Sequence, residues 1–291
     1  MTPLAYTFRT DTLFKMLFTK HQDLLRAFVS ALLGIDVKDI GDFSVMNPEI
    51  PPDVLGFKYC RLDIHMDVNM RQVDVEVQVA DEGNFRERVL YYGARLCTGA
   101  LKAGEDYAEL RPTILISLLG FNLFECTGYR SCFGVFEADR RECLSDKLVW
   151  HFYELRKVPE ALDKDDALCL WLALFKANTE EDLAQIEALG VPVMNQAISA
   201  FRALAKSDEF RRAEEMREMA RKEEAWRLGH AMRQGKEEGK AEGRAEGRAE
   251  GAAATARSVA RAALQMNLSV DDVAQFCGLP RDEVASLMQS E

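Results

Sequence analysis

The sequence predicts an α/β domain followed by a charged repeat and a small helical tail. Apolar residues recur at helical spacing from residue 13 to residue 33. Residues 62–68 and 73–79 instead alternate apolar and polar side chains, which is typical of half-buried strands. A densely charged stretch begins at residue 208. We therefore expect three segments: a globular domain over 1–207, a charged segment over 208–251 and a tail over 252–291.

The predicted N-terminal helical region begins after Thr10 and Asp11 and ends at Gly34. Its apolar positions keep the rhythm of an amphipathic helix, and glycine is a common residue just past a helix end. The proline-rich residues 47–56 follow and predict a loop. Further along, the longest apolar run, residues 167–175, predicts a buried helix.

Length and composition limit the classes of protein. The chain has 291 residues, of which 48% are hydrophobic, and this is enough to bury a proper core. Nowhere do about 18 apolar residues follow one another, so we expect neither a membrane span nor a signal peptide. The net charge of −11 argues against a protein that coats nucleic acid through a basic surface. An acidic metal site beside a local basic strip is compatible with this charge.

Seven cysteines at irregular spacings predict buried thiols, not a disulfide framework. An odd number cannot pair completely, and several of them lie in apolar runs. We therefore expect a reducing, cytoplasmic environment. The sequence contains no CxxC pair, so a structural zinc site has little support.

The charged segment and the tail each allow two interpretations. Residues 208–251 hold 12 acidic and 11 basic residues, with glycine at every fourth position from 235 to 251. This repeat is consistent with a helix that contacts a partner helix through its small-residue stripe, or with a solvated linker. In the tail, Ser269 predicts the start of a helix and Gly278 predicts its end, before a second short helix. The outline is similar to a helix-turn-helix, but the acidic second helix favours a helical hairpin for self-association into a homo-oligomer.

The two runs RLDIHMDV (61–68) and RQVDVEVQVA (71–80) predict a β-hairpin, because only Asn69 and Met70 lie between them. Asn69 tolerates the positive φ of a two-residue turn, whereas Met70 does not suit it, so a longer turn stays open. Two-residue and four-residue turns give the same register, and a three- or five-residue turn would shift it. That register pairs Asp63 with Glu76, His65 with Asp74 and Asp67 with Gln72.

Carboxylates at Asp63 and Glu76 would repel one another at cross-strand distance unless a cation or proton lay between them. Oxygen ligands at such spacing suit Mg²⁺ or Mn²⁺. Gln78 lies on the same face of the predicted hairpin. The alternative is an ordinary polar face in contact with water, which is the commoner use of such alternation.

Successive blocks of the chain resemble the Rpn family of recombination-promoting nucleases, often labelled transposases, within the PD-(D/E)XK nuclease superfamily. The resemblance covers roughly residues 8–125, and the charged repeat and helical tail also fit the family. It implies a mixed sheet flanked by helices and metal-dependent hydrolysis of phosphodiester bonds. The blocks, in unbroken order, are FKMLF, NPEIPPD, RLDI, VEVQVA, FRERVLYYGARLCTGALKAGEDY and RPTILISLLGFNLF.

The resemblance also implies roles for single residues. Asp63 and Glu76 match the two acidic metal ligands, with Mg²⁺ as the expected ion and Mn²⁺ or Ca²⁺ as alternatives. Asp11 fits the acidic position that some members use to complete the metal shell. Gln78 stands where the superfamily usually has lysine, and it would orient the attacking water without supplying a positive charge.

Residues 84–102 predict a helix that carries several basic side chains. With the family in view, we expect this helix to lie along DNA with its basic groups at phosphates. The alternative is an amphipathic helix whose tyrosines pack in the core and whose arginines are solvated. The basic residues are Arg86, Arg88, Arg95 and Lys102.

Three functions are consistent with these patterns. The first is an Mg²⁺-dependent DNA endonuclease that promotes recombination, in connection with mobile elements. The second is a catalytically weak DNA-binding or oligomeric scaffold that retains the nuclease fold. The third is a nuclease that acts on RNA through the same site. The first is our prediction.

Overall fold

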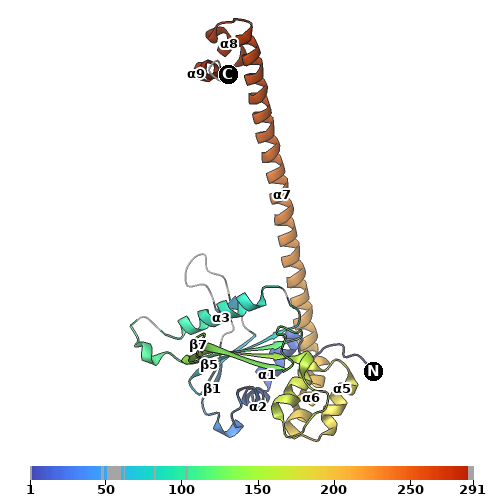
Figure 1. Ribbon diagram of the computed structural model, residues 1–291. Coiled ribbons are helices and arrows are strands. Elements are labelled where there is room, and N and C mark those ends of the chain that lie inside the picture. The colour runs from blue at the N-terminus through green and yellow to red at the C-terminus, as the bar shows by residue number, and fades with distance from the viewer. Residues whose placement is uncertain are drawn as a thin grey trace. The chain divides into compact units, whose positions relative to one another are not determined.

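The computed structural model describes residues 2–46, 49–50, 60–61, 63–81, 83–101 and 104–287. The chain divides into two compact units, Met1–Glu215 and Met216–Glu291. The first unit is a six-stranded mixed sheet with helices on both faces (Figure 1). This is the α/β architecture that the sequence predicts.

The strands of the sheet follow the spatial order β1, β4, β5, β6, β8, β7. Strand β6 runs parallel to β5 and β8, and the other neighbours are antiparallel. A separate short pairing joins β2 to β3. The bounds are Phe43–Met46 (β1), Glu49–Ile50 (β2), Cys60–Arg61 (β3), Ile64–Val68 (β4), Arg71–Gln78 (β5), Thr113–Leu119 (β6), Arg130–Phe136 (β7) and Cys143–Glu154 (β8).

Helices cover the two faces of the sheet unequally. Figure 1 shows α3 on one side of the sheet and α1 and α2 on the other. The predicted N-terminal helical region is split into two helices at His21, and Gly34 ends the second in the left-handed conformation, as predicted. The bounds are Asp11–Lys20 (α1), Gln22–Leu33 (α2), Phe85–Gly99 (α3), Ala167–Lys176 (α4), Glu180–Ala188 (α5) and Pro192–Ala205 (α6), with 3-10 turns at Val37–Asp39, Tyr107–Glu109 and Leu155–Lys157.

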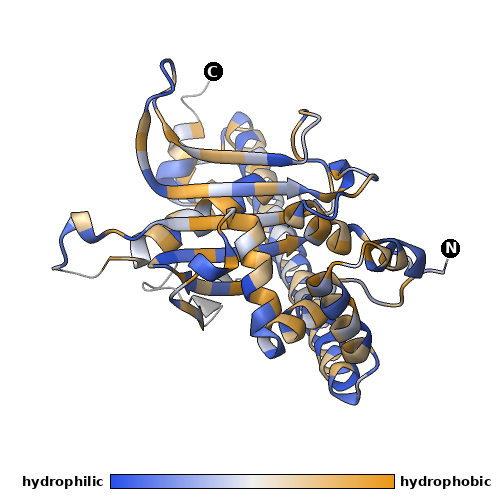
Figure 2. Cartoon of the chain, turned by 90° about the horizontal axis from the view of Figure 1, so that it is seen from below, coloured by the Kyte–Doolittle hydropathy of each residue, from blue (hydrophilic) through white to orange (hydrophobic). Residues whose placement is uncertain are grey.

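The main hydrophobic core lies on the face opposite α3. It joins the even-numbered side chains of β4 and the odd-numbered ones of β5 to the helices α1, α2, α4, α5 and α6. Helix α4 is the predicted buried helix, and its Trp171 and Phe175 are almost fully buried. Burial of such large aromatic side chains supplies much of the free energy that holds the sheet and helices together. Figure 2 shows the alternation of hydrophobic and hydrophilic residues along the strands.

Strands β4 and β5 form the predicted hairpin. Val68 pairs with Arg71, so the turn consists of Asn69 and Met70 alone. Both turn residues have positive φ, 49° and 61°, as a type I′ turn requires. The longer turn that the unsuitability of Met70 had left open is therefore not formed. Asn69 fixes the turn, because its side chain accepts a hydrogen bond from the Gly41 amide at 2.9 Å and donates one to the Asp39 carbonyl at 3.0 Å.

Helix α3 connects the parallel strands β5 and β6, so it crosses the face of the sheet that carries the polar side chains of the hairpin. A second, smaller core lies beneath it and includes Phe85, Val89 and Phe152. Helix and sheet approach closely at Gly93, where an added Cβ would lie 2.8 Å from the Trp150 ring nitrogen. The helix therefore acts as a lid of fixed position over this face.

The charged repeat is helical, and its contact with a partner helix stays a prediction. It lies within α7 (Asp208–Gln265), which is followed by α8 (Val270–Cys277) and α9 (Arg281–Leu287). Ser269 caps α8 by accepting a hydrogen bond from the Asp272 amide at 3.2 Å, and Gly278 ends it with a φ of 64°. In the second unit, Ala260, Val273 and Val284 form a small core between the three helices.

The cysteines differ from the expectation of buried thiols. Among the described side chains six are free cysteines, and Cys126, Cys132 and Cys143 are exposed. They lie at or near β7 and the start of β8, at an edge of the sheet that no other described strand covers. Most of the predicted proline-rich loop lies outside the described residues. None of the helices in the described ranges has the length and apolar character needed to cross a membrane.

We predict that Met70→Gly stabilises the first unit. Met70 is 69% exposed and loses little packing, whereas its left-handed backbone costs roughly 1 kcal/mol that glycine avoids. Part of this gain is offset by the greater freedom of glycine in the unfolded chain, so we expect a net gain of about 0.5 kcal/mol in the free energy of unfolding, measured by denaturant titration. Asn69→Ala should change stability in the opposite direction. Lower stability of Met70→Gly would contradict the turn geometry.

Candidate active site

Three carboxylates meet at one end of the β4–β5 hairpin, and they come from different parts of the fold. Asp11 is the first residue of α1, Asp63 directly precedes β4, and Glu76 lies in β5. The observed pairing of Ile64 with Val75 places Asp63 and Glu76 at the next opposed position. The predicted pairs of His65 with Asp74 and of Asp67 with Gln72 are present in the sheet. The register predicted from the sequence is therefore confirmed.

The polar face of the hairpin is buried, so the alternative of a water-exposed face is wrong. His65, Asp74 and Glu76 are 5%, 1% and 8% exposed. Both carboxylate oxygens of Asp74 are buried without a hydrogen-bond partner. Leaving a carboxylate in such surroundings is costly, because burial penalises the charged form. This arrangement is typical of a functional site and not of a structural strand pair.

Lys15 holds two of the carboxylates together. Its Nζ lies 2.8 Å from Asp11 Oδ1 and 3.1 Å from Asp63 Oδ1. The other oxygen of Asp63 accepts a hydrogen bond from the Val77 amide at 2.9 Å. Lys15 was not among the site residues predicted from the sequence. Its position four residues after Asp11 on a helix was the signal that could have identified it.

The ionisation of the site is shifted toward the protonated forms. Burial, reinforced by the charge of Asp63, raises the pKa of Glu76 to about 7, against the opposing effect of Arg88 and Lys15. Burial also raises the pKa of Asp63, although the Lys15 ammonium and the Val77 amide act in the other direction. The pKa of Asp74 lies well above its ordinary value, chiefly because this side chain is fully buried. The positive charges of Lys15 and Arg88 are therefore too few to keep the pKa values of Asp63 and Glu76 at their ordinary values.

The donor set suits a hard divalent cation. Asp11, Asp63 and Glu76 offer only oxygen ligands, which Mg²⁺ and Mn²⁺ prefer. No described residue contributes a hydrogen bond to the Glu76 carboxylate. Within the described ranges no three His, Cys, Asp or Glu side chains already form a metal cage. The Lys15 ammonium provides the positive charge between Asp11 and Asp63 instead.

Gln78 is held in one orientation at the end of β5. Its Oε1 accepts a hydrogen bond from Arg88 Nη2 at 2.5 Å, and its Nε2 donates one to the Ala80 carbonyl at 2.8 Å. Because a donor faces the oxygen and an acceptor faces the nitrogen, the amide cannot be reversed without losing both bonds. Gln78 therefore lies on the same face of β5 as Glu76, and Arg88 is hydrogen-bonded to the Gln78 side chain.

The basic residues predicted to contact DNA lie in different surroundings. Arg86 is exposed and donates to the Leu123 carbonyl at 2.7 Å, with its guanidinium over the Phe124 ring. Arg88 points to Gln78, and Arg95 is partly buried on the same helix. Lys102 lies outside the described residues. Contact of these groups with phosphates stays a prediction.

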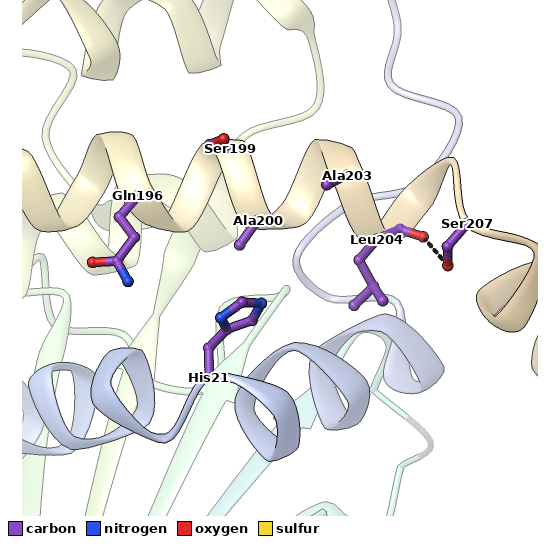
Figure 3. A pocket seen from close by; sticks show the side chains of 7 residues that line it. All are labelled: His21, Gln196, Ser199, Ala200, Ala203, Leu204 and Ser207. Atoms are coloured by element: carbon purple, nitrogen blue, oxygen red, sulfur yellow. Dashed lines mark hydrogen bonds between the residues drawn. The ribbon is translucent and has the colours of Figure 1, made fainter.

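A hollow whose lining contains none of the three carboxylates lies between His21 and helix α6 (Figure 3). Its described lining consists mainly of small and apolar side chains from α6, including Ala200 and Leu204, and Ser207 Oγ donates a hydrogen bond to the Leu204 carbonyl at 2.8 Å. Its only ionisable lining residue is His21. This hollow therefore lacks the convergent acidic groups that distinguish the hairpin site.

We predict that Glu76→Gln stabilises the metal-free protein at alkaline pH. Because the pKa rises from 4.5 to about 7 on folding, the folded state binds more protons than the unfolded state between these values. Stability conferred by the wild-type side chain therefore falls as pH rises through this window, by roughly 3 kcal/mol at most. Glutamine has no charge to lose.

The measurement is the free energy of unfolding in a chelator from pH 5 to pH 8.5. Glu76→Gln should match wild type near pH 5 and exceed it above pH 7.5. The exposed Glu142→Gln serves as the control, and its difference from wild type should stay small at every pH. A pH-independent difference for Glu76→Gln would contradict a raised pKa.

Comparison with known proteins identifies the family of the chain. The chain matches a protein family described as PD-(D/E)XK nuclease family transposase over residues 8–231. Searches of curated proteins and of solved structures found no match. The matched region includes the sheet, the three carboxylates and the helix over them. The chain belongs to the PD-(D/E)XK nuclease family of transposases.

Proposed function

We propose that the chain is a divalent-metal-dependent DNA endonuclease that hydrolyses phosphodiester bonds and promotes recombination, in connection with mobile elements. The observation that supports this most directly is the group of the half-buried Asp11 and Asp63 and the buried Glu76, beside which lie the cations Lys15 and Arg88. A family of nucleases and transposases is the expected context for such a group. The reaction would have water as nucleophile and DNA as substrate.

Each residue has a defined task in this proposal. Asp63 and Glu76 hold Mg²⁺, with Mn²⁺ or Ca²⁺ as substitutes, and Asp11 completes the set of oxygen ligands. The bound ion would lower the pKa of a water molecule and stabilise charge on the reacting phosphate. Gln78 directs the attacking water through its amide. Arg86, Arg95 and Lys102 hold phosphates of the DNA backbone.

The cleavage assay uses supercoiled plasmid with Mg²⁺ or Mn²⁺ and the variants Asp63→Asn, Glu76→Gln and Asp11→Asn. We expect the first two to lower kcat by about 100-fold or more, because each removes a charged ligand while keeping its shape. Asp11→Asn should have a smaller effect, since its carboxylate completes a set that the others define. Glu142→Gln, on the exposed β7–β8 connection, should cleave like wild type.

Metal affinity gives an independent readout of the same proposal. Calorimetric titration with Mn²⁺ at pH 8.5 should show binding by wild type and strongly reduced binding by Asp63→Asn and Glu76→Gln. Wild-type cleavage by either folded variant, or Mn²⁺ binding that neither substitution weakens, would overturn the assignment. Absence of metal-dependent cleavage by wild type would favour the scaffold.

We also propose that α7 associates with a second copy of the chain. Met216, Met219 and Trp226 project from one face of this helix and are 71%, 69% and 63% exposed. Aromatic and methionine side chains are enriched where proteins associate. The charged residues that surround them are balanced in sign, which permits ion pairs between two copies.

Sedimentation of the full chain tests this association. Met219→Glu combined with Trp226→Glu should lower the mass toward that of a single chain, because it places charges in the apolar contact. Met232→Glu is the matched control, since Met232 is equally exposed but projects from the opposite side of the helix. An unchanged mass in the double variant, or the same loss in the control, would exclude this face as the contact.

A further inference from the structure

We propose that Arg88 is a positioning residue that acts through Gln78, and that the pair replaces a single cationic side chain at the reacting phosphate. The proposal rests on the hydrolytic function proposed above and assigns it a residue beyond the carboxylates and the glutamine. It starts from the contact between Arg88 Nη2 and Gln78 Oε1 at 2.5 Å. Gln78 alone is neutral, so it cannot offset negative charge.

The contact leaves Gln78 ready to act as a donor. One side of its amide is occupied by Arg88 and one N–H by the Ala80 carbonyl. A primary amide has two N–H groups, so the second can address water or a phosphate oxygen. A guanidinium on the carbonyl oxygen withdraws electron density from the amide and strengthens that N–H as a donor. Arg88 thus places a positive charge next to the Gln78 amide and makes the remaining N–H of that amide a stronger donor.

Arg88 is itself held in place. It lies in the first turn of α3, where its amide donates to the Asn84 carbonyl at 3.1 Å. Its guanidinium is partly buried and lies over the Phe85 ring, 5.4 Å from the ring centre. Cation–π contact and partial burial restrict the side chain, and the planar guanidinium keeps its donor on the Gln78 oxygen. The geometry favours a fixed charge over a mobile surface arginine.

The charges of Arg88 and Lys15 reach the acidic group from different helices, α3 and α1. Arg88 acts on Glu76 by lowering the pKa of that carboxyl, which burial otherwise raises. Lys15 is occupied by Asp11 and Asp63, at 2.8 and 3.1 Å. The two cations therefore have different partners. Lys15 pairs with carboxylates, whereas Arg88 is hydrogen-bonded to Gln78, which follows Glu76 by two residues on β5.

This position suits the chemistry of hydrolysis. The water oxygen forms a bond to phosphorus, the bond from phosphorus to one bridging oxygen breaks, and the proton lost by the water ends on the leaving oxygen through solvent. Negative charge grows on the phosphate oxygens during this exchange. Donors fixed before the reaction stabilise that charge without paying for reorganisation. The Arg88–Gln78 pair is such a fixed donor beside Glu76.

The experiment compares Arg88→Met, Gln78→Lys and the double variant in the plasmid assay at pH 8.5. We expect Arg88→Met to lower kcat by about 100-fold with a much smaller change in KM. Gln78→Lys restores a positive charge at the same place, so it should raise the kcat of Arg88→Met at least about tenfold. In the presence of Arg88 the same lysine places two cations side by side and should not raise kcat.

Three further measurements separate this role from a structural one. Arg88→Lys, which keeps the charge but loses the fork, should retain more activity than Arg88→Met. In metal-free protein the pKa of Glu76, followed by carboxyl NMR, should rise in Arg88→Met. Mn²⁺ affinity at pH 8.5 should not weaken, because the substitution removes a cation and no metal ligand. Arg140→Met, an exposed arginine on the β7–β8 connection, controls for the loss of one charge.

The outcomes are distinct. Wild-type kcat in Arg88→Met overturns the inference while leaving the proposed function intact. A low kcat that Gln78→Lys does not restore also overturns it, and so does a low kcat accompanied by lost Mn²⁺ binding or by unfolding of both Arg88→Met and Arg88→Lys. Absence of metal-dependent cleavage by wild type overturns the proposed function and this inference with it. Restoration by Gln78→Lys supports it.

Discussion

Burial of like charges beneath α3 is the constraint on which the rest of the molecule depends. The hairpin register brings Asp63 and Glu76 to one position, and Asp74 lies on the same face with both oxygens unpartnered. Water would normally stabilise such groups, but the helix excludes it. The free energy that keeps them buried must therefore come from elsewhere. The opposite face of the sheet supplies it, through a core of large aromatic side chains that includes Phe14, Phe28 and Trp171.

The same constraint explains the distribution of cations. Lys15 reaches the carboxylates from α1 and Arg88 reaches Gln78 from α3, so each cation belongs to a different layer of the fold. Neither can take its place until its own helix has docked. The balance of charge at the site is consequently a property of the assembled layers. A sheet without these helices would hold Asp63, Asp74 and Glu76 but not the counter-charges of Lys15 and Arg88.

Local patterns were enough to predict the frame of the site. Strict alternation around Asn69 and Met70 favoured an even turn over a three- or five-residue turn, and the register of an even turn is present in the structure. Gly34 and Ser269 marked helix boundaries correctly, because capping depends on neighbours in the sequence. The family resemblance agreed with a mixed sheet between helices, and the match over residues 8–231 confirms it.

Features that depend on distant parts of the chain could not be predicted. The period-two pattern in the sequence is the same whether the polar face of the strands contacts water or a helix. The burial of Asp74 could therefore not be predicted from this pattern. The contact of Arg88 with Gln78 depends on where α3 crosses the sheet, which spacing along the chain does not specify. Met70 in a left-handed turn opposes its own propensity, and the strand pairing on either side overrides that preference. The exposed cysteines of β7 and β8 follow from the position of these strands at an edge.

The crossover through α3 also determines when the acidic face loses its water as the protein folds. Strands β4 and β5 are separated by two residues and can close in microseconds, because little chain entropy is lost. Strand β6 can pair with β5 only after the intervening α3 has been brought across, which is a slower, longer-range step. The early hairpin therefore forms with its carboxylates still hydrated. Their desolvation belongs to the late steps of folding. The free-energy penalty of desolvation therefore destabilises the native state, and it raises the unfolding rate more than it lowers the rate of the first collapse.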